Sequence, residues 1–228
     1  MKVIYRISDA GYQKEKPPYI YNARCLSNAI KVFDKADWHI IADNVSTETM
    51  WMIKKYSSNV ESVSVGHGAG TFNLALDRAL QYNDNEVIYF LENDYLHLPG
   101  ADEILAEGFS LEFPFVALYD HPDKYIDPKL GGNPQCHGGC ERTRVYLTKS
   151  CHWKVTNSTT MTFAATVRTL KRTEPILRAH TCGTHPHDYP MFLDLIKSGE
   201  TLITPIPGYA THGETKWLTP LRNWSKVQ

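Results

Sequence analysis

Val87-Ile88-Tyr89-Phe90-Leu91-Glu92-Asn93-Asp94 is an apolar run that ends abruptly in two acids separated by one residue. An apolar run without alternation is typical of a strand covered on both faces, as in a mostly parallel sheet with helices on either side. Ligands of open α/β sheets bind beyond the carboxyl ends of the strands. Two carboxylates placed there can hold a hard divalent cation against a phosphate. The stretch therefore predicts an α/β fold with a ligand site at its end.

Three strand-and-helix units lead up to this stretch. Strands are predicted over residues 3–7, 38–42 and 60–65. Helices should begin at Asn22 and at Ser46, and a third helix should follow the glycine-rich turn 66–70. Repeated units of this length predict right-handed crossovers and a Rossmann-like, doubly wound sheet.

The second half of the chain is less regular. Residues 113–119 should form a strand, whereas 127–141 is rich in Pro and Gly and should be a loop. The β-rich segments 144–147 and 160–165 predict a small added region of sheet. Helices are expected over 167–178 and from Asp188 to a stop at Gly199, with one short strand and then loop over 201–224.

Length and composition indicate one sizeable core. The 228 residues contain no linker or charge run that would divide them, so a single domain over 1–228 is expected. A hydrophobic content of 42% with 21% charged residues is that of an ordinary globular protein. A net charge of −1 gives no basic field for nucleic acid, and no membrane span or signal peptide is expected. A cytoplasmic location and five reduced cysteines follow as expectations.

Residues 65–94 combine a glycine-rich turn, a helix containing Asn73 and Ala75, a hydrophobic strand and the triplet Glu92-Asn93-Asp94. This order resembles the nucleotide-sugar half of the GT-A glycosyltransferases, and the similarity extends over residues 1–119. Segments 89–100 and 148–163 also look like the small glycosyltransferases encoded by chlorella-type giant viruses.

The resemblance implies a GT-A-like fold, with a nucleotide-sugar half (1–119) and an acceptor-binding and catalytic half (120–228). Family members usually carry Asp-any-Asp where this chain has Glu92-Asn93-Asp94. The resemblance implies that Asp94 contacts the metal. Glu92 either binds the ribose or reaches the metal through water.

A divalent metal ion suits the expected sugar transfer for chemical reasons that do not depend on the resemblance. Cleavage of a nucleoside diphosphate sugar leaves charge on the β-phosphate, which Mg²⁺ or Mn²⁺ neutralises. Such cations take one or two protein carboxylates, and phosphate oxygens and waters complete the shell. An isolated acid-any-acid triplet is also common in a solvated turn or a helix cap, but its position after a buried strand favours a ligand site.

Two further residues are assigned by the resemblance. Many GT-A enzymes complete the metal site with a C-terminal histidine, and the segment 209–214 around His212 resembles this one; an imidazole favours Mn²⁺. Inverting GT-A enzymes place a catalytic base at the start of a helix near the acceptor, where this chain has Asp188. The same residue suits an N-cap, and Asp120, Asp123 and Glu174 are competing candidates for the base.

Nucleotide contacts are expected at the ends of the first strands and around the glycine-rich turn. The candidate residues are Arg6, Ser8, Asp9, Asp43, Asn44, Gly66, Asn73, Arg78, Glu92 and Asn93. Several of them could instead cap helices or lie exposed. The turn matches neither a P-loop nor the dinucleotide-binding fingerprint.

Acceptor contacts are expected in the second half, where aromatic rings and hydroxyls suit a sugar. The candidates are His121, Trp153, Thr159 and Thr160. A tryptophan in the core is an equally good interpretation of Trp153.

A structural zinc clip is a rival interpretation of one segment. Cys136 and Cys140, followed by Cys151 and His152, have spacings that zinc sites allow. They lack the paired regularity of a zinc ribbon, so reduced cysteines are preferred.

The sequence therefore predicts a metal-dependent glycosyltransferase, inverting, that uses a UDP- or GDP-type sugar donor and a glycan or other hydroxyl acceptor. A sugar nucleotidyltransferase is the closest alternative. That class expects a glycine-rich, Arg- and Lys-bearing loop after the first strand, and residues 9–16 contain only Gly11 as glycine, which argues against it. A non-catalytic carbohydrate-binding protein would not need acids at the end of a buried strand.

Overall fold

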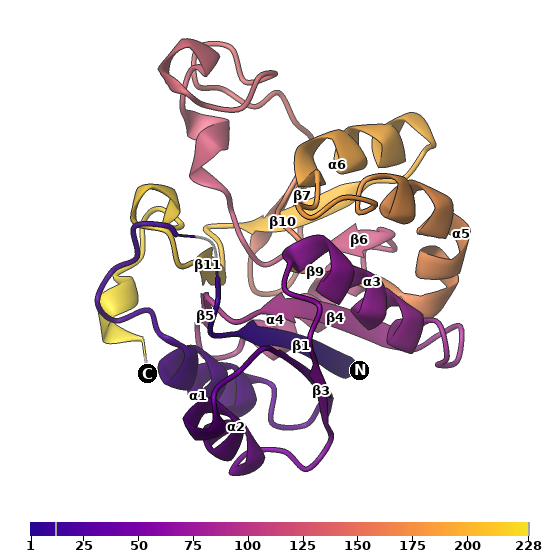
Figure 1. Cartoon of the computed structure of the whole chain (residues 1–228). Coiled ribbons are helices and arrows are strands. Elements are labelled where there is room, and N and C mark those ends of the chain that lie inside the picture. Colours follow the sequence, from indigo (N-terminus) through magenta and orange to yellow (C-terminus); the bar gives the residue numbers. More distant parts are fainter. Residues whose placement is uncertain (12, 228) are drawn as a thin grey trace.

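The computed structural model describes residues 1–11 and 13–227 (Figure 1). Within these residues a nine-stranded sheet has the order β3 (Val60–Val63), β2 (Asp37–Asp43), β1 (Lys2–Ser8), β4 (Val87–Glu92), β9 (Phe163–Thr166), β6 (Phe115–Val116), β10 (Leu202–Ile206), β8 (His152–Thr156) and β7 (Val145–Leu147). Only β8 and β9 among these strands run against the others, so the sheet is mostly parallel, as predicted.

Helices cover both faces of the sheet. One face carries α1 (Asn22–Val32), α2 (Thr47–Lys54) and α4 (Ala101–Phe109), and the other carries α3 (Gly68–Ala79), α5 (Val167–Ala179) and α6 (Asp188–Lys197). Alternate residues of β1 point to the two layers, since Tyr5 packs with the first group and Ile4 with the second. Burial on both faces explains why the strands read as continuous apolar runs.

Several predicted boundaries shift. The helix α3 begins at Gly68, inside the expected glycine-rich turn, because the His67 imidazole caps it by accepting from Gly70 N–H. At the start of α1, Tyr21 rather than Asn22 is the N-cap. The strand expected over 113–119 shrinks to β6, and α4 lies in a segment for which no helix was predicted.

The polar strand β8 was not predicted. Its Lys154 is buried, and the Lys154 ammonium lies 2.9 Å from Asp120 and 3.0 Å from Glu141. Polar and apolar residues alternate along β8, with Trp153 and Val155 packed in the core, so a strand pattern was present in the sequence; the burial of Lys154 depends on its two distant partners. These ion pairs also anchor the protruding segment 122–144, which contains the short 3-10 helices η1 (Pro122–Tyr125) and η2 (Pro128–Leu130) (Figure 1).

A second, two-stranded sheet brings the C-terminal region to the end of β4. Strand β5 (Tyr95–His97) follows the acidic triplet and pairs antiparallel with β11 (Ala210–His212), so that His212 faces Tyr95 in register. The prediction of only one strand after residue 201 is wrong, since both β10 and β11 lie there. The pairing of β5 with β11 therefore brings His212 close to the acids at the end of β4. Among the described residues, none of the helices has both the length and the apolar content that crossing a bilayer requires.

Candidate active site

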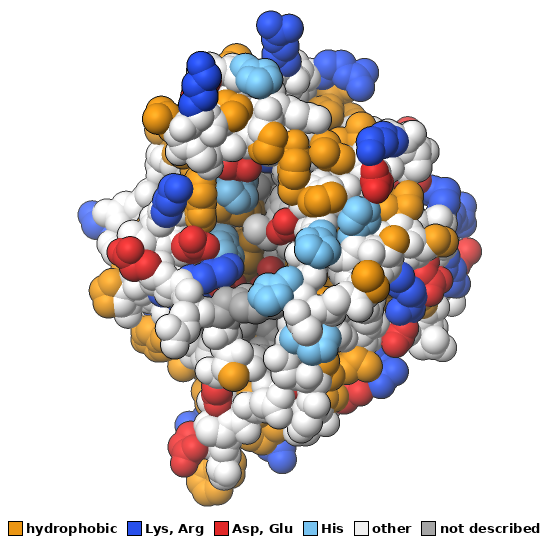
Figure 2. Space-filling view, turned by 45° about the horizontal axis from the view of Figure 1, so that its top comes forward, with side chains coloured by type: hydrophobic (Ala, Val, Ile, Leu, Met, Phe, Trp, Pro, Cys, Tyr) orange, Lys and Arg blue, Asp and Glu red, His pale blue; other side chains and the backbone are white. Residues whose placement is uncertain are grey.

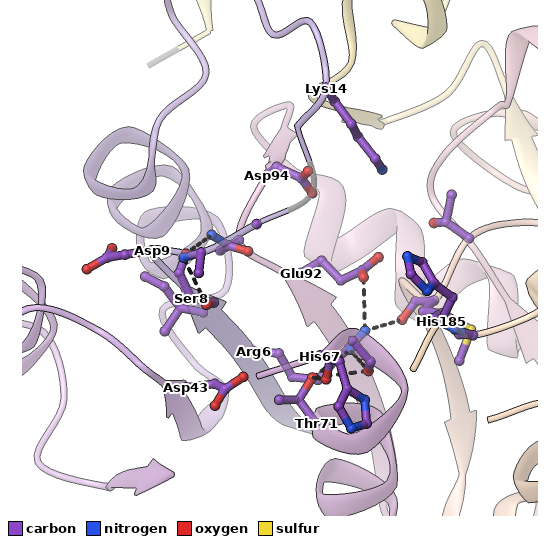
Figure 3. Close-up of a pocket in the computed structure, with 18 of the residues that line it drawn as sticks. Arg6, Ser8, Asp9, Lys14, Asp43, His67, Thr71, Glu92, Asp94 and His185 are labelled. Carbon is purple, nitrogen blue, oxygen red and sulfur yellow. Dashed lines mark hydrogen bonds and ion pairs between the residues drawn. The ribbon is translucent and has the colours of Figure 1, made fainter. Parts of the chain in front are cut away.

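A cavity of about 900 Å³ opens at the carboxyl ends of β1, β2 and β4. Figure 2 shows the hollow with acidic and histidine side chains around it, and Figure 3 shows the side chains that line it. Its polar lining includes Arg6, Ser8, Asp9, Lys14, Lys16, Asn22, Asp43, His67, Thr71, Glu92, Asn93, Asp94, Thr160, His185, Asp188 and His212. The cavity lies where an open α/β sheet places its ligands.

Asp94 and His212 face each other at this cavity. Oδ2 of Asp94 lies 3.3 Å from Nε2 of His212, and their side chains are 14% and 7% exposed. The ring of His212 is held between aromatic neighbours, with centroid distances of 5.4 Å to Tyr95 and 6.2 Å to Tyr119. Packing on two rings fixes the imidazole, so a nitrogen and a carboxylate oxygen converge on one point.

Asp94 is ionised across the ordinary pH range. Burial by itself raises the pKa of a carboxyl group, but His212 and the ammonium groups of Lys16 and Lys14 outweigh it and hold the pKa of Asp94 well below its usual value. A carboxylate that is already deprotonated can bind a cation without releasing a proton.

The donor set of Asp94 and His212 fits a divalent cation with few protein ligands. No group of three or more His, Cys, Asp or Glu side chains in residues 1–11 and 13–227 is arranged to hold a metal. Mg²⁺-type sites use one or two carboxylates and complete their shells with phosphate and water, and an imidazole suits Mn²⁺ better than Mg²⁺. The residues present therefore fit Mn²⁺ that is shared with a phosphorylated ligand.

Glu92 is held in a different contact from Asp94. It is the register partner of Arg6 on the neighbouring strand, and Oε1 of Glu92 lies 3.2 Å from the Arg6 guanidinium. Arg6 is buried and also donates to the carbonyl oxygens of Gly68 and Met161. Thr162 donates to the other oxygen of Glu92. The first acid of the triplet thus forms an ion pair at the cavity floor rather than a contact with His212 (Figure 3).

Asp188 begins α6 and lines the same cavity. His187 is the N-cap, so Asp188 does not cap the helix. Its carboxylate accepts a hydrogen bond of 2.7 Å from the adjacent Tyr189 N–H. Burial, with a smaller contribution from the Glu92 carboxylate, raises the pKa of Asp188 to about 6, although the Tyr189 N–H, Lys14 and His212 lower it. A carboxylate with this pKa in a ligand cavity has the property of a general base near neutral pH.

The predicted nucleotide-binding residues at the strand ends also line the cavity, but they already hold local structure. Asp43 accepts from the N–H groups of Val65 and Gly66 and so fixes the turn into α3. Asp9 accepts from Ser46 N–H at the start of α2. Asn93 donates to the carbonyl of Ser8 and to Asn22.

Three other predicted binding residues are not among those that line the cavity. Asn44 donates to Asp43, and Asn73 exchanges two hydrogen bonds with Thr181. Arg78 forms an ion pair with Glu61, at 2.7 Å. Their polar groups are satisfied elsewhere, so we correct the expectation that these three residues contact the ligand.

The acceptor prediction needs a similar correction. Thr160 lines the cavity, but Trp153 is fully buried in the core and donates to Thr148. Thr159 is buried too, and His121 packs between the rings of Tyr119 and Trp217. Burial removes the surfaces of Trp153 and Thr159 that an acceptor would contact.

The competing candidates for the base and for a zinc site are also explained by local contacts. Asp120 and Asp123 pair with the buried lysines Lys154 and Lys124, and Glu174 pairs with Arg178. Cys136 is buried and Cys140 exposed, both as free thiols. Among the described residues, no group of three or more His, Cys, Asp or Glu side chains gathers around these cysteines.

Among the side chains that line the cavity, sequence reasoning missed the lysines Lys14 and Lys16 and the histidines His67 and His185. Lys14 and Lys16 belong to the segment after the first strand. That segment was judged as a candidate ligand-binding loop by its glycine content, and its lysines were a signal that could have been used. His185 comes from the connection between α5 and α6, held against α3 by a hydrogen bond from Ala69 N–H to Thr184 O. That long-range contact leaves no signal in the sequence.

No family model and no curated protein matches the chain. Solved structures do match. GalNAc-T7, solved with UDP, GalNAc and Mn²⁺, aligns over 92% of this chain and 42% of its own, with a TM-score of 0.58 and 13% identity. A197 from STIV aligns over 98% of this chain and 92% of its own, with a TM-score of 0.52 and 15% identity.

The inositol-1-phosphate CTP transferase from T. maritima aligns over 90% of this chain and 84% of its own, with a TM-score of 0.50 and 10% identity. Identities of this size show the fold alone. The chain has the GT-A-like α/β fold that glycosyltransferases and nucleotidyltransferases share.

Proposed function

We propose that the chain is a metal-dependent glycosyltransferase that transfers a sugar from a UDP- or GDP-type donor to a hydroxyl group of a glycan or other acceptor. The observation that carries the proposal is the convergence of Asp94 and His212 in a cavity that also contains Asp188. The solved structure of GalNAc-T7 with UDP and Mn²⁺ supports the choice of donor class and metal. The finer resemblance to giant-virus enzymes stays a prediction, since no sequence match tests it.

Asp94 and His212 are the residues that would hold Mn²⁺. A bound divalent cation neutralises the charge that develops on the diphosphate when the sugar leaves. Arg6 and Glu92 form a rigid floor beneath this position, because Arg6 is tied to α3 through Gly68 and to the segment before β9 through Met161. Rigid residues beneath a charged ligand reduce the reorganisation that binding and reaction require.

Asp188 is the proposed base of an inverting transfer. Its carboxylate takes the proton of the acceptor hydroxyl as that oxygen attacks the anomeric carbon from the side opposite the diphosphate. The raised pKa of about 6 leaves the carboxylate ionised at neutral pH and basic enough to accept this proton. Thr160, on the cavity wall, is the predicted acceptor residue that remains in reach.

Hydrolysis of nucleotide sugars tests the reaction class, since many glycosyltransferases hydrolyse their donors slowly without an acceptor. A panel of UDP- and GDP-sugars, with Mn²⁺ or with EDTA, should yield free sugar and nucleoside diphosphate from one donor only in the presence of metal. Asp188→Asn should retain donor binding. A product that keeps the donor's anomeric configuration would rule out Asp188 as the direct base.

A nucleotidyltransferase remains a second candidate because of one observation. Lys14 and Lys16, in the segment after β1, line the cavity, so the argument from glycine content against this class loses its force. Incubation with CTP or UTP and a sugar phosphate separates the classes. Release of inorganic pyrophosphate identifies a nucleotidyltransferase, whereas release of nucleoside diphosphate from a nucleotide sugar identifies a glycosyltransferase.

A further inference from the structure

The described part of the segment between β1 and α1 runs beside the C-terminal region (Figure 1), and several of its residues line the cavity. Between Lys14 and Lys16, the carbonyl of Glu15 accepts a hydrogen bond of 2.8 Å from Thr215 N–H, just beyond β11. This bond holds the backbone while the two lysine side chains extend to the cavity, as Figure 3 shows for Lys14. Both lysine side chains are 31% exposed, so solvent and ligand can reach them.

The two ammonium groups contact the groups that are proposed to bind metal. Nζ of Lys16 lies 3.1 Å from Oδ2 of Asp94, the same oxygen that faces His212. Nζ of Lys14 lies 3.3 Å from Nε2 of His212 and 3.8 Å from Glu214. A cation bound by Asp94 Oδ2 and His212 Nε2 would replace both contacts, because it uses the same two atoms and repels the ammonium groups.

Apart from Asp188, which is proposed as the base, the remaining acids of the cavity are already engaged in other contacts. Glu92 is paired with Arg6, Asp43 accepts from backbone N–H groups, and Asp9 accepts from α2. A ligand that brings its own negative charge is therefore the natural partner of the released ammonium groups. A diphosphate carries that charge and would share the metal as well.

We propose that Lys14 and Lys16 bind the diphosphate of the donor, and that without donor they occupy Asp94 and His212. The inference rests on the proposed metal at these two residues. Metal frees the lysines for the diphosphate, and the diphosphate draws the lysines away from the metal ligands. Each ligand thus strengthens the binding of the other by the same factor, as linkage requires.

The test measures Mn²⁺ and nucleoside diphosphate binding separately and together by calorimetry. The proteins are wild type, Lys14→Gln, Lys16→Gln and the double variant, with Lys55→Gln as a control at an exposed site outside the cavity. UDP and GDP are titrated in EDTA, Mn²⁺ is titrated alone, and the nucleotide is then titrated with Mn²⁺ saturating.

Replacement of the lysines should change the affinities for Mn²⁺ and for the diphosphate in opposite directions. We expect the double variant to bind Mn²⁺ alone about 5-fold more tightly and the diphosphate in EDTA about 10-fold more weakly, which is the scale of ordinary coupling energies. The factor by which Mn²⁺ strengthens diphosphate binding should become smaller than in wild type, because only the direct contact between metal and diphosphate then couples the two ligands. Lys14→Arg and Lys16→Arg should keep the diphosphate affinity, and Lys55→Gln should match wild type throughout.

Unchanged diphosphate affinity in the folded double variant would overturn the lysine assignment. Unchanged or weaker Mn²⁺ affinity in that variant would overturn the proposal that the lysines occupy Asp94 and His212 when the donor is absent. If wild type takes up no Mn²⁺ even with saturating UDP or GDP, the proposed metal site itself fails, and with it that proposal. The titrations in EDTA then still decide whether the lysines bind the diphosphate, so the two failures are distinguishable.

Discussion

Oδ2 of Asp94 lies 3.3 Å from Nε2 of His212, although the two residues come from opposite halves of the chain. The contact follows from the pairing of β5 with β11, which places His212 opposite Tyr95, the residue after Asp94. A carboxylate and an imidazole brought together by a separate two-stranded sheet, above the carboxyl ends of the main sheet, form the centre of the proposed site.

Asp188 should control the pH dependence of the transfer. A base with a pKa of about 6 is protonated below that pH, so kcat/KM should fall about tenfold for each unit further down. Asp188→Asn should lower kcat by roughly 10²- to 10⁴-fold and remove this limb. Donor affinity, measured by calorimetry, should stay unchanged. A variant with the wild-type pH profile would contradict the assignment.

The same substitution should stabilise the protein. The folded pKa of Asp188, about 6, lies above its ordinary value of 3.8, so the folded state holds this proton more tightly than the unfolded state. The ionised carboxylate therefore costs stability as pH rises from about 4 to 6, and the cost stays constant above that range. Asp188→Asn should raise the free energy of unfolding by on the order of 1 kcal/mol at pH 7 to 8. Thermal melts should converge below about pH 4.

Gly213 should be required for the approach of β11 to the acidic turn. A Cβ at this position would lie 2.6 Å from the carbonyl oxygen of Asp94 and 2.4 Å from Ile20. Gly213→Ala should destabilise the protein by about 1–3 kcal/mol and weaken Mn²⁺ binding, because strand and turn must separate. Gly183→Ala is the matched control, since a Cβ there meets nothing within 4 Å. Chemical denaturation measures both; equal stability of the two variants would refute the packing argument.

Lys154 should be essential for stability rather than for chemistry. Its removal leaves the buried carboxylates of Asp120 and Glu141 without their cation. Lys154→Ala should cost about 3–5 kcal/mol of unfolding free energy. Lys171→Ala breaks an exposed pair with Asp84, in which the side chains are 48% and 50% exposed, and should cost less than about 1 kcal/mol. Similar losses in urea denaturation would show that burial does not decide the contribution of these pairs.

The sequence was sufficient to predict an element where the chemical character of its side chains agrees with their burial. The apolar run 87–91 predicts β4 because both of its faces are buried, and the acids after it fall at the ligand edge of the sheet. The sequence was insufficient where a polar residue is buried by a distant partner. The burial of Lys154 depends on its ion pairs with Asp120 and Glu141, and the sequence left open whether Trp153 contacts a sugar or, as the structure shows, lies in the core.

The lysines of the cavity show a second limit of prediction from the sequence. Lys14 and Lys16 reach Asp94 and His212 only because the segment that carries them lies beside β11, and no local pattern encodes that neighbourhood. For the same reason, the sequence alone left open whether Glu92 takes part in metal binding. Its ion pair with Arg6 depends on the register of β1 and β4.

Isothermal titration of UDP- and GDP-sugars, with and without Mn²⁺, tests the central claim most directly. One donor should bind to the wild-type protein much more tightly with Mn²⁺, and the metal-dependent gain should disappear in Asp94→Ala and in His212→Ala. The Lys55→Gln control should behave as wild type. Donor binding that ignores Mn²⁺ and survives Asp94→Ala would contradict a metal-dependent transferase built on Asp94 and His212.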